Sequence, residues 1–309
     1  ISNKAVLTAR GVDIPEWNNE PMKDWQVRRM EVYAAMIDIM DQGIGKIIST
    51  LEKKGELENT VIFYMHDNGG CAETLNSNET EITLTDEQKK GKPFAKDSIF
   101  LGKIPTYTRA GEFIRSGKGV IPGPANTWTA YSEEWANVSS TPFRLYKHFV
   151  HEGGIATPLI IHWPKGIRAK GKLRTQPGHL IDIMATCVEI AGLQYPTNFN
   201  GNTIHPLEGK SLVPAFTDKP INRDFIFWEH EGNRAFRMGN WKLVSKTQKQ
   251  RKFTPADENA WELYDMEEDP SESNNLALKY PDKVKSMAAL WEKEAQRTLA
   301  KPWPWGSNK

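Results

Sequence analysis

The sequence predicts an α/β protein that ends in a small antiparallel α+β subdomain. One long amphipathic helix is followed by an all-apolar strand with a polar, glycine-rich exit, which is typical of α/β folds. After about residue 220 the pattern changes to several short strands and a final charged helix. We therefore assign residues 1–220 to the α/β part and residues 221–309 to the small subdomain.

Composition and charge exclude several functional classes. The chain has 309 residues, of which 39% are hydrophobic and 26% are charged, as in a globular protein with a core. Its 40 Lys+Arg and 39 Asp+Glu residues give a net charge of +1, so no overall field attracts nucleic acid or anionic lipid. No apolar run approaches the roughly 18 residues of a membrane span. The sequence predicts neither a nucleic-acid partner nor a membrane span.

The first strong element is a helix. Apolar residues from Met30 to Leu51 recur at spacings of three and four, which places them on one helical face. Gly43 and Gly45 lie within this helix, where each costs about 1 kcal/mol relative to alanine. We therefore expect close packing against both glycines, and we expect the helix to end at Gly55.

Two strands are expected to be buried. Residues 61–65 and 158–163 are almost wholly apolar, as in strands covered on both faces. The first strand runs directly into His-Asp-Asn-Gly-Gly at residues 66–70. Ligands of α/β sheets bind beyond the carboxyl ends of strands, so Asp67 and Asn68 lie at the expected edge of a site.

The remaining chain divides into a loop, a helix and the C-terminal elements. Residues 71–140 lose all periodicity and collect Gly, Pro, Asn and Ser, which predicts a long loop. A helix is expected at 180–191. Strands are expected at residues 225–228, 235–237, 241–244 and 261–264, followed by a helix at 281–298.

Five residues are candidates for chemistry, and each has an ordinary structural interpretation. Asp67 and Asn68 offer hard oxygen ligands that suit Ca²⁺ or Mg²⁺, or they form an Asx turn. Lys147 precedes a Gly-Gly bend and could present its charge to sulfate or phosphate, or it is a surface lysine. His151 and His230 could each donate a proton or serve a purely structural role.

Two further features imitate reactive groups. Residues 140–144 read Ser-Thr-Pro-Phe-Arg, close to a Ser-x-Pro-x-Arg nucleophile motif, and Cys71 follows a Gly-Gly pair. Neither has a base close to it in the sequence, and a lone cysteine is most often a small buried apolar residue. We do not assign a nucleophile to either.

Taken together and in this order, the segments resemble the sulfatase family, specifically the bacterial-type arylsulfatases. The resemblance covers most of the chain from about residue 25 onward. The matching stretches include Asp-Asn-Gly-Gly at 67–70, Thr-Pro-Phe-Arg at 141–144, Tyr-Lys at 146–147, His-Glu-Gly-Gly at 151–154, Pro-Gly-His-Leu-Ile-Asp at 177–182, Trp-Glu-His-Glu-Gly-Asn-Arg at 228–234 and Trp-Lys-Leu-Val at 241–244.

The resemblance implies an alkaline-phosphatase-like mixed sheet sandwiched by helices, with a small C-terminal sheet domain, and hydrolysis of sulfate esters. By motif, Asp67 and Asn68 would bind a divalent cation, usually Ca²⁺, and Lys147 would contact the sulfate. His151 and His230 would bind substrate. The family's nucleophile is a formylglycine made from Cys or Ser. A periplasmic or extracellular location would also follow from the resemblance.

The departures from the family pattern are equally informative. Neither Cys71 nor Cys187 lies in a Cys-x-Pro-x-Arg motif, and the family's early Asp-Asp pair is absent. We therefore expect the formylglycine upstream of Ile1, an inactive 309-residue chain, and a sheet that is either incomplete or covered by a neighbour. The alternatives are a non-catalytic sulfatase-like fragment that binds a ligand or partner, and a phosphoester hydrolase of the same superfamily. The substrate would be a small-molecule or carbohydrate sulfate ester, and the oligomeric state stays open.

Overall fold

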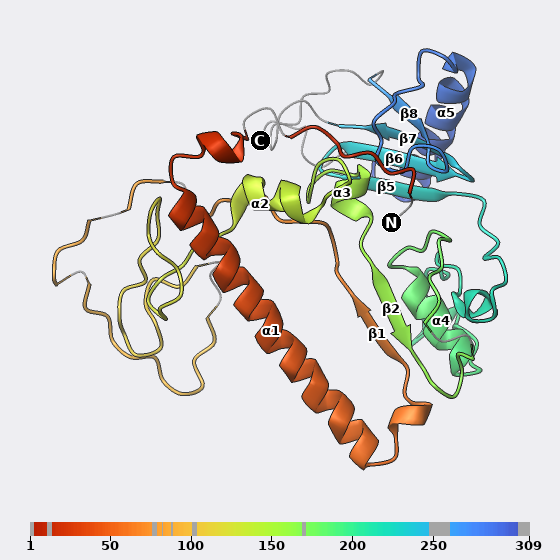
Figure 1. Ribbon diagram of the computed structural model, residues 1–309. Helices are drawn as coiled ribbons and strands as arrows, with labels where there is room; N and C mark the ends of the chain where they lie inside the picture. Colours follow the sequence, from red (N-terminus) through yellow and green to blue (C-terminus); the bar gives the residue numbers. More distant parts are fainter. Residues whose placement is uncertain are drawn as a thin grey trace.

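The computed structural model combines a long helix, a two-stranded sheet and a separate four-stranded sheet (Figure 1). It describes residues 3–10, 14–75, 79–81, 83–87, 89–100, 104–168, 171–246 and 260–301. Among these residues, no helix has the length and apolar character needed to cross a membrane.

The long helix α1 spans Lys23–Lys53, which confirms the helix predicted from the spacing of apolar residues. Its first half is anchored, since Trp25 Nε1 donates a hydrogen bond to the Val120 carbonyl (2.9 Å) and Tyr33 stacks on Tyr131. Its second half is not covered: Met36 and Ile47 are 64% and 62% exposed. The helix therefore forms where it was expected, but much of its apolar face meets solvent.

The expected close packing at the helix glycines is not present. A Cβ placed on Gly43 or Gly45 would have no other described atom within 4 Å. The prediction is wrong because no described residue packs over either glycine. The glycines cost helix stability without a packing gain in this structure.

The central strands pair antiparallel and are less buried than expected. Strand β1, Ile62–Met65, pairs with β2, Leu159–His162, in a sheet of these two strands only. All of β1 is half-buried, and three of the four β2 residues are exposed. Burial on both faces was predicted wrongly, because two strands with little cover cannot shield apolar side chains.

Short elements connect these strands to the C-terminal part. The region predicted to be a loop contains α2 (Ser132–Ser139), and α3 (Glu152–Ile155) leads into β2. The expected helix at 180–191 is α4 (Asp182–Ile190). The remaining elements are short: η1 (Trp17–Asn19), η2 (Leu57–Asn59), β3 (Asn198–Phe199), β4 (Asn202–Thr203) and η3 (Val213–Thr217).

The C-terminal part is the predicted antiparallel α+β unit. Its sheet runs β5-β6-β7-β8 in chain order: Ile226–His230, Asn233–Met238, Trp241–Ser245 and Glu262–Asp265. Helix α5 (Pro281–Arg297) packs on one face, and the two share a buried apolar core of Phe236, Leu243, Leu263, Met287, Trp291 and Ala295.

The other face of this sheet positions the site. Val150, which precedes α3, and Ile155, its last residue, pack against Ala235, Val244 and Tyr264 of the sheet. The C-terminal sheet therefore supports the chain segment that contains Lys147 and His151.

Candidate active site

Two glycine pairs bring the Asp-Asn loop against the segment that carries Lys147. The amide of Gly69 donates to the Gly154 carbonyl, and the amide of Lys147 donates to the Gly70 carbonyl, each at 2.9 Å. A Cβ on Gly69 would lie only 1.8 Å from the Gly153 oxygen, so no side chain fits there. This close backbone contact fixes Lys147 next to the loop of Asp67 and Asn68.

Ser140 stabilises the same contact between the two glycine pairs. Its hydroxyl donates to the Gly153 carbonyl at 3.0 Å and accepts from the Gly70 amide at 3.3 Å, and the residue is buried. Arg144, at the other end of the Ser-Thr-Pro-Phe-Arg motif, forms an ion pair with Glu262 (Nη1–Oε2, 2.6 Å). The motif that imitates a nucleophile therefore has a structural role here.

Asp67 and Asn68 have the chemistry of a hard-cation site. Asp67 is exposed, and its carboxylate has no hydrogen-bond or ion-pair partner among the described residues. The Asn68 amide donates from Nδ2 to the Gly69 carbonyl (2.8 Å), which leaves Oδ1 as an acceptor. The two residues thus fit a cation such as Ca²⁺ in kind, although Ca²⁺ needs six to eight oxygen ligands.

Lys147 lies in a polar cluster that the sequence did not reveal. Its Nζ is 3.4 Å from Glu73 Oε2 and 4.0 Å from Cys71 Sγ. Burial alone would raise the pKa of the Glu73 carboxyl, but Lys147, Cys71 and His148 outweigh it and lower that pKa. Glu73 is therefore ionised at neutral pH, and an anion bound by Lys147 would compete with it.

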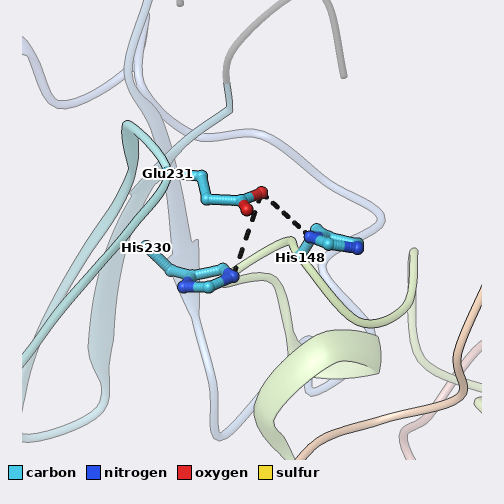
Figure 2. Close-up of side chains that lie close together, drawn as sticks. All are labelled: His148, His230 and Glu231. Carbon is cyan, nitrogen blue, oxygen red and sulfur yellow. Dashed lines mark hydrogen bonds and ion pairs between the residues drawn. The ribbon is translucent and has the colours of Figure 1, made fainter. Parts of the chain in front are cut away.

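His230, at the end of a strand of the C-terminal sheet, lies beside His148 and Glu231 (Figure 2). It ends β5, is half exposed, and its ring stacks on that of His148 with 5.9 Å between centroids. Glu231 joins both, with Oε2 2.9 Å from His148 Nδ1 and 4.0 Å from His230 Nε2. The structure thus brings His230 against His148, the residue that follows Lys147.

His151 has a different environment from the one expected. Its ring is fully buried, and Nε2 lies 3.3 Å from Glu262 Oε2. Nδ1 is buried and has no hydrogen-bond partner among the described residues. The predicted contact with substrate gains no support from this position, because the ring is enclosed between Glu262 and the edge of Phe149.

Glu262 is held in its charged form. Burial would raise the pKa of its carboxyl, but hydrogen bonds from His151, Arg144 and Tyr264 outweigh burial and hold the pKa well below its usual range. The bonds from Arg144 and His151 join strand β8 to the residues on either side of Lys147. The contact between the C-terminal sheet and this segment is therefore ionic as well as apolar.

A second buried ion cluster holds α3. Lys242 of β7 is fully buried, with Nζ 2.6 Å from Glu152 Oε1 and 2.7 Å from Glu272 Oε1. Glu272 also accepts a hydrogen bond from the Glu152 amide at 2.8 Å. Burial would lower the pKa of Lys242, but the two carboxylates outweigh it and raise that pKa, so the lysine stays charged.

Two family models match the chain. The model described as sulfatase matches residues 7–193, and the one described as N-sulphoglucosamine sulphohydrolase, C-terminal, matches residues 143–298. An uncharacterized sulfatase of Schizosaccharomyces pombe is 31% identical over 275 residues, which cover 87% of this chain and 44% of that protein. The N-acetylglucosamine-6-O-sulfatase of Bacteroides thetaiotaomicron is 26% identical, over 87% of this chain and 36% of its own length. The chain thus spans less than half the length of these relatives.

Solved structures show the same fold. The crystal structure of Ps i-CgsB matches with a TM-score of 0.52 and 22% identity, over 86% of this chain and 43% of that one. A glycosaminoglycan-metabolism sulfatase of Bacteroides thetaiotaomicron matches with a TM-score of 0.50 and 18% identity, over 83% of this chain and 43% of that one. The likeness establishes the fold of this chain as part of the alkaline-phosphatase-like architecture.

Proposed function

The chain belongs to the sulfatase family, and from that premise we propose that it forms the cation- and sulfate-binding part of a sulfuric ester hydrolase. The observation that carries the proposal is the glycine contact that sets Lys147 beside Asp67 and Asn68. It holds the Lys147 backbone against the loop that follows β1 and carries these two oxygen ligands. Sulfate-ester cleavage builds negative charge on sulfate oxygens, and fixed positive groups stabilise that charge.

We assign the residues as follows. Asp67 and Asn68 would hold a Ca²⁺ ion, which when bound neutralises charge on the sulfate oxygens. Lys147 would contact the sulfate, and Glu73 would orient the lysine until the anion enters. The other cation ligands and a formylglycine nucleophile would lie in a part of the parent protein that precedes Ile1. The 309-residue chain alone is then expected to be inactive.

The proposed substrate is a carbohydrate sulfate ester. A relative that matches most of this chain is named N-acetylglucosamine-6-O-sulfatase, and the second matching family model is that of a sulphoglucosamine enzyme. His230, half exposed and stacked on His148, would contact the sugar. No observation favours the phosphoester alternative over this one.

The test uses the full-length parent protein with an aryl sulfate and the corresponding aryl phosphate. Lys147→Ala should lower kcat on the sulfate by about 10²–10³-fold, the usual effect of losing one transition-state donor. The control is Lys46→Ala, which removes an exposed lysine in the second half of α1. Unchanged sulfate turnover in Lys147→Ala, or faster phosphate than sulfate hydrolysis, would contradict the assignment.

Cation removal tests the Asp67–Asn68 assignment separately. Chelation should abolish sulfate turnover, and added Ca²⁺ should restore it in the wild type but poorly in Asp67→Asn. Equal recovery in the variant would show that these residues are not cation ligands. Turnover by the isolated 309-residue chain would contradict an upstream nucleophile.

A further inference from the structure

Three potential metal ligands converge from two separate parts of the chain (Figure 2). His148 lies in the loop after Lys147, whereas His230 and Glu231 form the end of β5 and the turn into β6. One ligand atom from each residue lies within 4.8 Å of the other two. Among the described residues, this is the one group of three His, Cys, Asp or Glu side chains with such spacing.

The backbone beneath this cluster is fixed by a buried amide. Asn233 is 3% exposed, and its Nδ2 donates to the carbonyls of both His148 (2.9 Å) and His230 (3.1 Å). His148 and Glu231 both have left-handed backbones, with φ of 84° and 50°. Such conformations persist when the surroundings enforce them, so the two loops that carry the ligands are held in fixed positions relative to each other.

The ligand types select the metal. Two imidazoles and one carboxylate suit Zn²⁺ and similar transition-metal ions, whereas Ca²⁺ prefers oxygen ligands only. Tetrahedral Zn²⁺ with bonds of about 2.0–2.2 Å separates its ligand atoms by about 3.3–3.6 Å. The observed separations include 2.9 Å and 4.0 Å, so small side-chain shifts reach that geometry.

An outer carboxylate completes the pattern. The second nitrogen of His148, Nε2, lies 3.8 Å from Glu73 Oε1. Metal-binding histidines commonly direct their other nitrogen to a carboxylate, which orients the ring and increases its basicity. Glu73 would play this part for His148 while it also pairs with Lys147.

We propose that His148, His230 and Glu231 form a Zn²⁺-type site with a fourth position open to water. The site is distinct in ligand chemistry from Asp67–Asn68 and does not depend on the proposed hydrolase activity. A bound ion would join the β5–β6 turn to the Lys147 loop, and it would occupy the His230 nitrogen proposed to contact sugar. Transition-metal ions are therefore expected to block substrate entry.

Calorimetric titration of the 309-residue chain with Zn²⁺ tests the site. The titration is carried out in a Cys71→Ser, Cys187→Ser background, which removes thiolates as competing ligands. One equivalent of Zn²⁺ should bind, while Ca²⁺ should not compete. His230→Ala and His148→Asn should each weaken binding by more than about tenfold; asparagine tolerates the left-handed backbone at position 148. Glu73→Gln should weaken binding by about tenfold, as for an outer-shell partner.

His205→Ala is the matched control, since it removes an exposed histidine elsewhere and should leave Zn²⁺ affinity unchanged. Circular dichroism confirms that each variant is folded. Titration with Co²⁺ gives an independent readout, because a His₂Glu site produces a tetrahedral absorption spectrum that His230→Ala should lose. Absence of saturable Zn²⁺ binding in the parent background, or equal affinity in His230→Ala and His205→Ala, would overturn the proposal.

Discussion

The helices α1 and α5 have the same kind of apolar stripe and entirely different surroundings. In α5 the stripe is buried, with Trp291 only 1% exposed against the four-stranded sheet. In the second half of α1, Met36 and Ile47 are mostly exposed, and Gly43 has open space above it. The periodic pattern therefore predicts a helix in both cases, but it does not reveal whether anything in the chain covers that helix.

Breaking the α5 core should have the largest effect on stability. Trp291→Ala removes a fully buried indole that stacks on Phe227 and packs in the core with Leu263. We expect the free energy of unfolding to fall by about 3–5 kcal/mol, the usual cost of such a truncation. Urea unfolding followed by circular dichroism measures this. A loss below 1 kcal/mol would mean that the core is not as closed as the structure shows.

Removing the buried Lys242 should lower the free energy of unfolding somewhat less than Trp291→Ala does. Lys242→Met leaves Glu152 and Glu272 facing each other without a counter-charge, which we expect to destabilise the protein by about 3 kcal/mol. The triple variant with Glu152→Gln and Glu272→Gln should recover most of that loss, because no unpaired charge remains. If the single and triple variants unfold at the same urea concentration, charge balance is not what holds α3.

Acid should weaken the interface between the two parts through Glu262. Its pKa is lowered in the folded state, so its stabilising contribution is complete above its ordinary value of 4.5 and is lost as pH falls below it. Glu262→Gln should cost about 2 kcal/mol at pH 7, as expected for hydrogen bonds to a charged group. The difference in the free energy of unfolding between wild type and variant should become smaller as pH drops to about 3. If this difference in the free energy of unfolding does not change with pH, Glu262 is not charged in the folded protein.

Substitutions in the exposed apolar stripe of α1 should have the smallest effect on the free energy of unfolding. Ile47→Ser should change the free energy of unfolding by no more than about 0.5 kcal/mol, because Ile47 loses little contact. The same urea experiment checks this, with Trp291→Ala as the contrasting variant. A loss above 2 kcal/mol would reveal that the stripe is covered in solution.

Local patterns predicted most of the elements, and long-range contacts account for what they missed. Helix α1 and the strands β5–β8 follow from periodicity and turn residues, whereas Asp67, Asn68 and Lys147 stay predictions made from motifs. Glu73 was not found because it lies in an aperiodic loop and its contacts, with Lys147 and His148, are distant in sequence. His151 looked like a site residue because its partner Glu262 is distant in sequence.

The burial of β1 and β2 was predicted wrongly for a related reason. An apolar strand indicates that burial is favourable, whereas actual burial depends on neighbouring elements. Strands β6 and β7 have such neighbours on both sides within the described chain, and β2 has only β1.

The ion pairs beneath the C-terminal sheet restrict how this protein can be recombined with its relatives. Lys242 and Glu262 lie in the C-terminal strands, but their partners Glu152 and Arg144 lie next to Lys147. A chimera that exchanges only the C-terminal subdomain would inherit one half of each pair. Crossover points placed before residue 140 keep both pairs together, so such chimeras should express as folded protein where later crossovers fail.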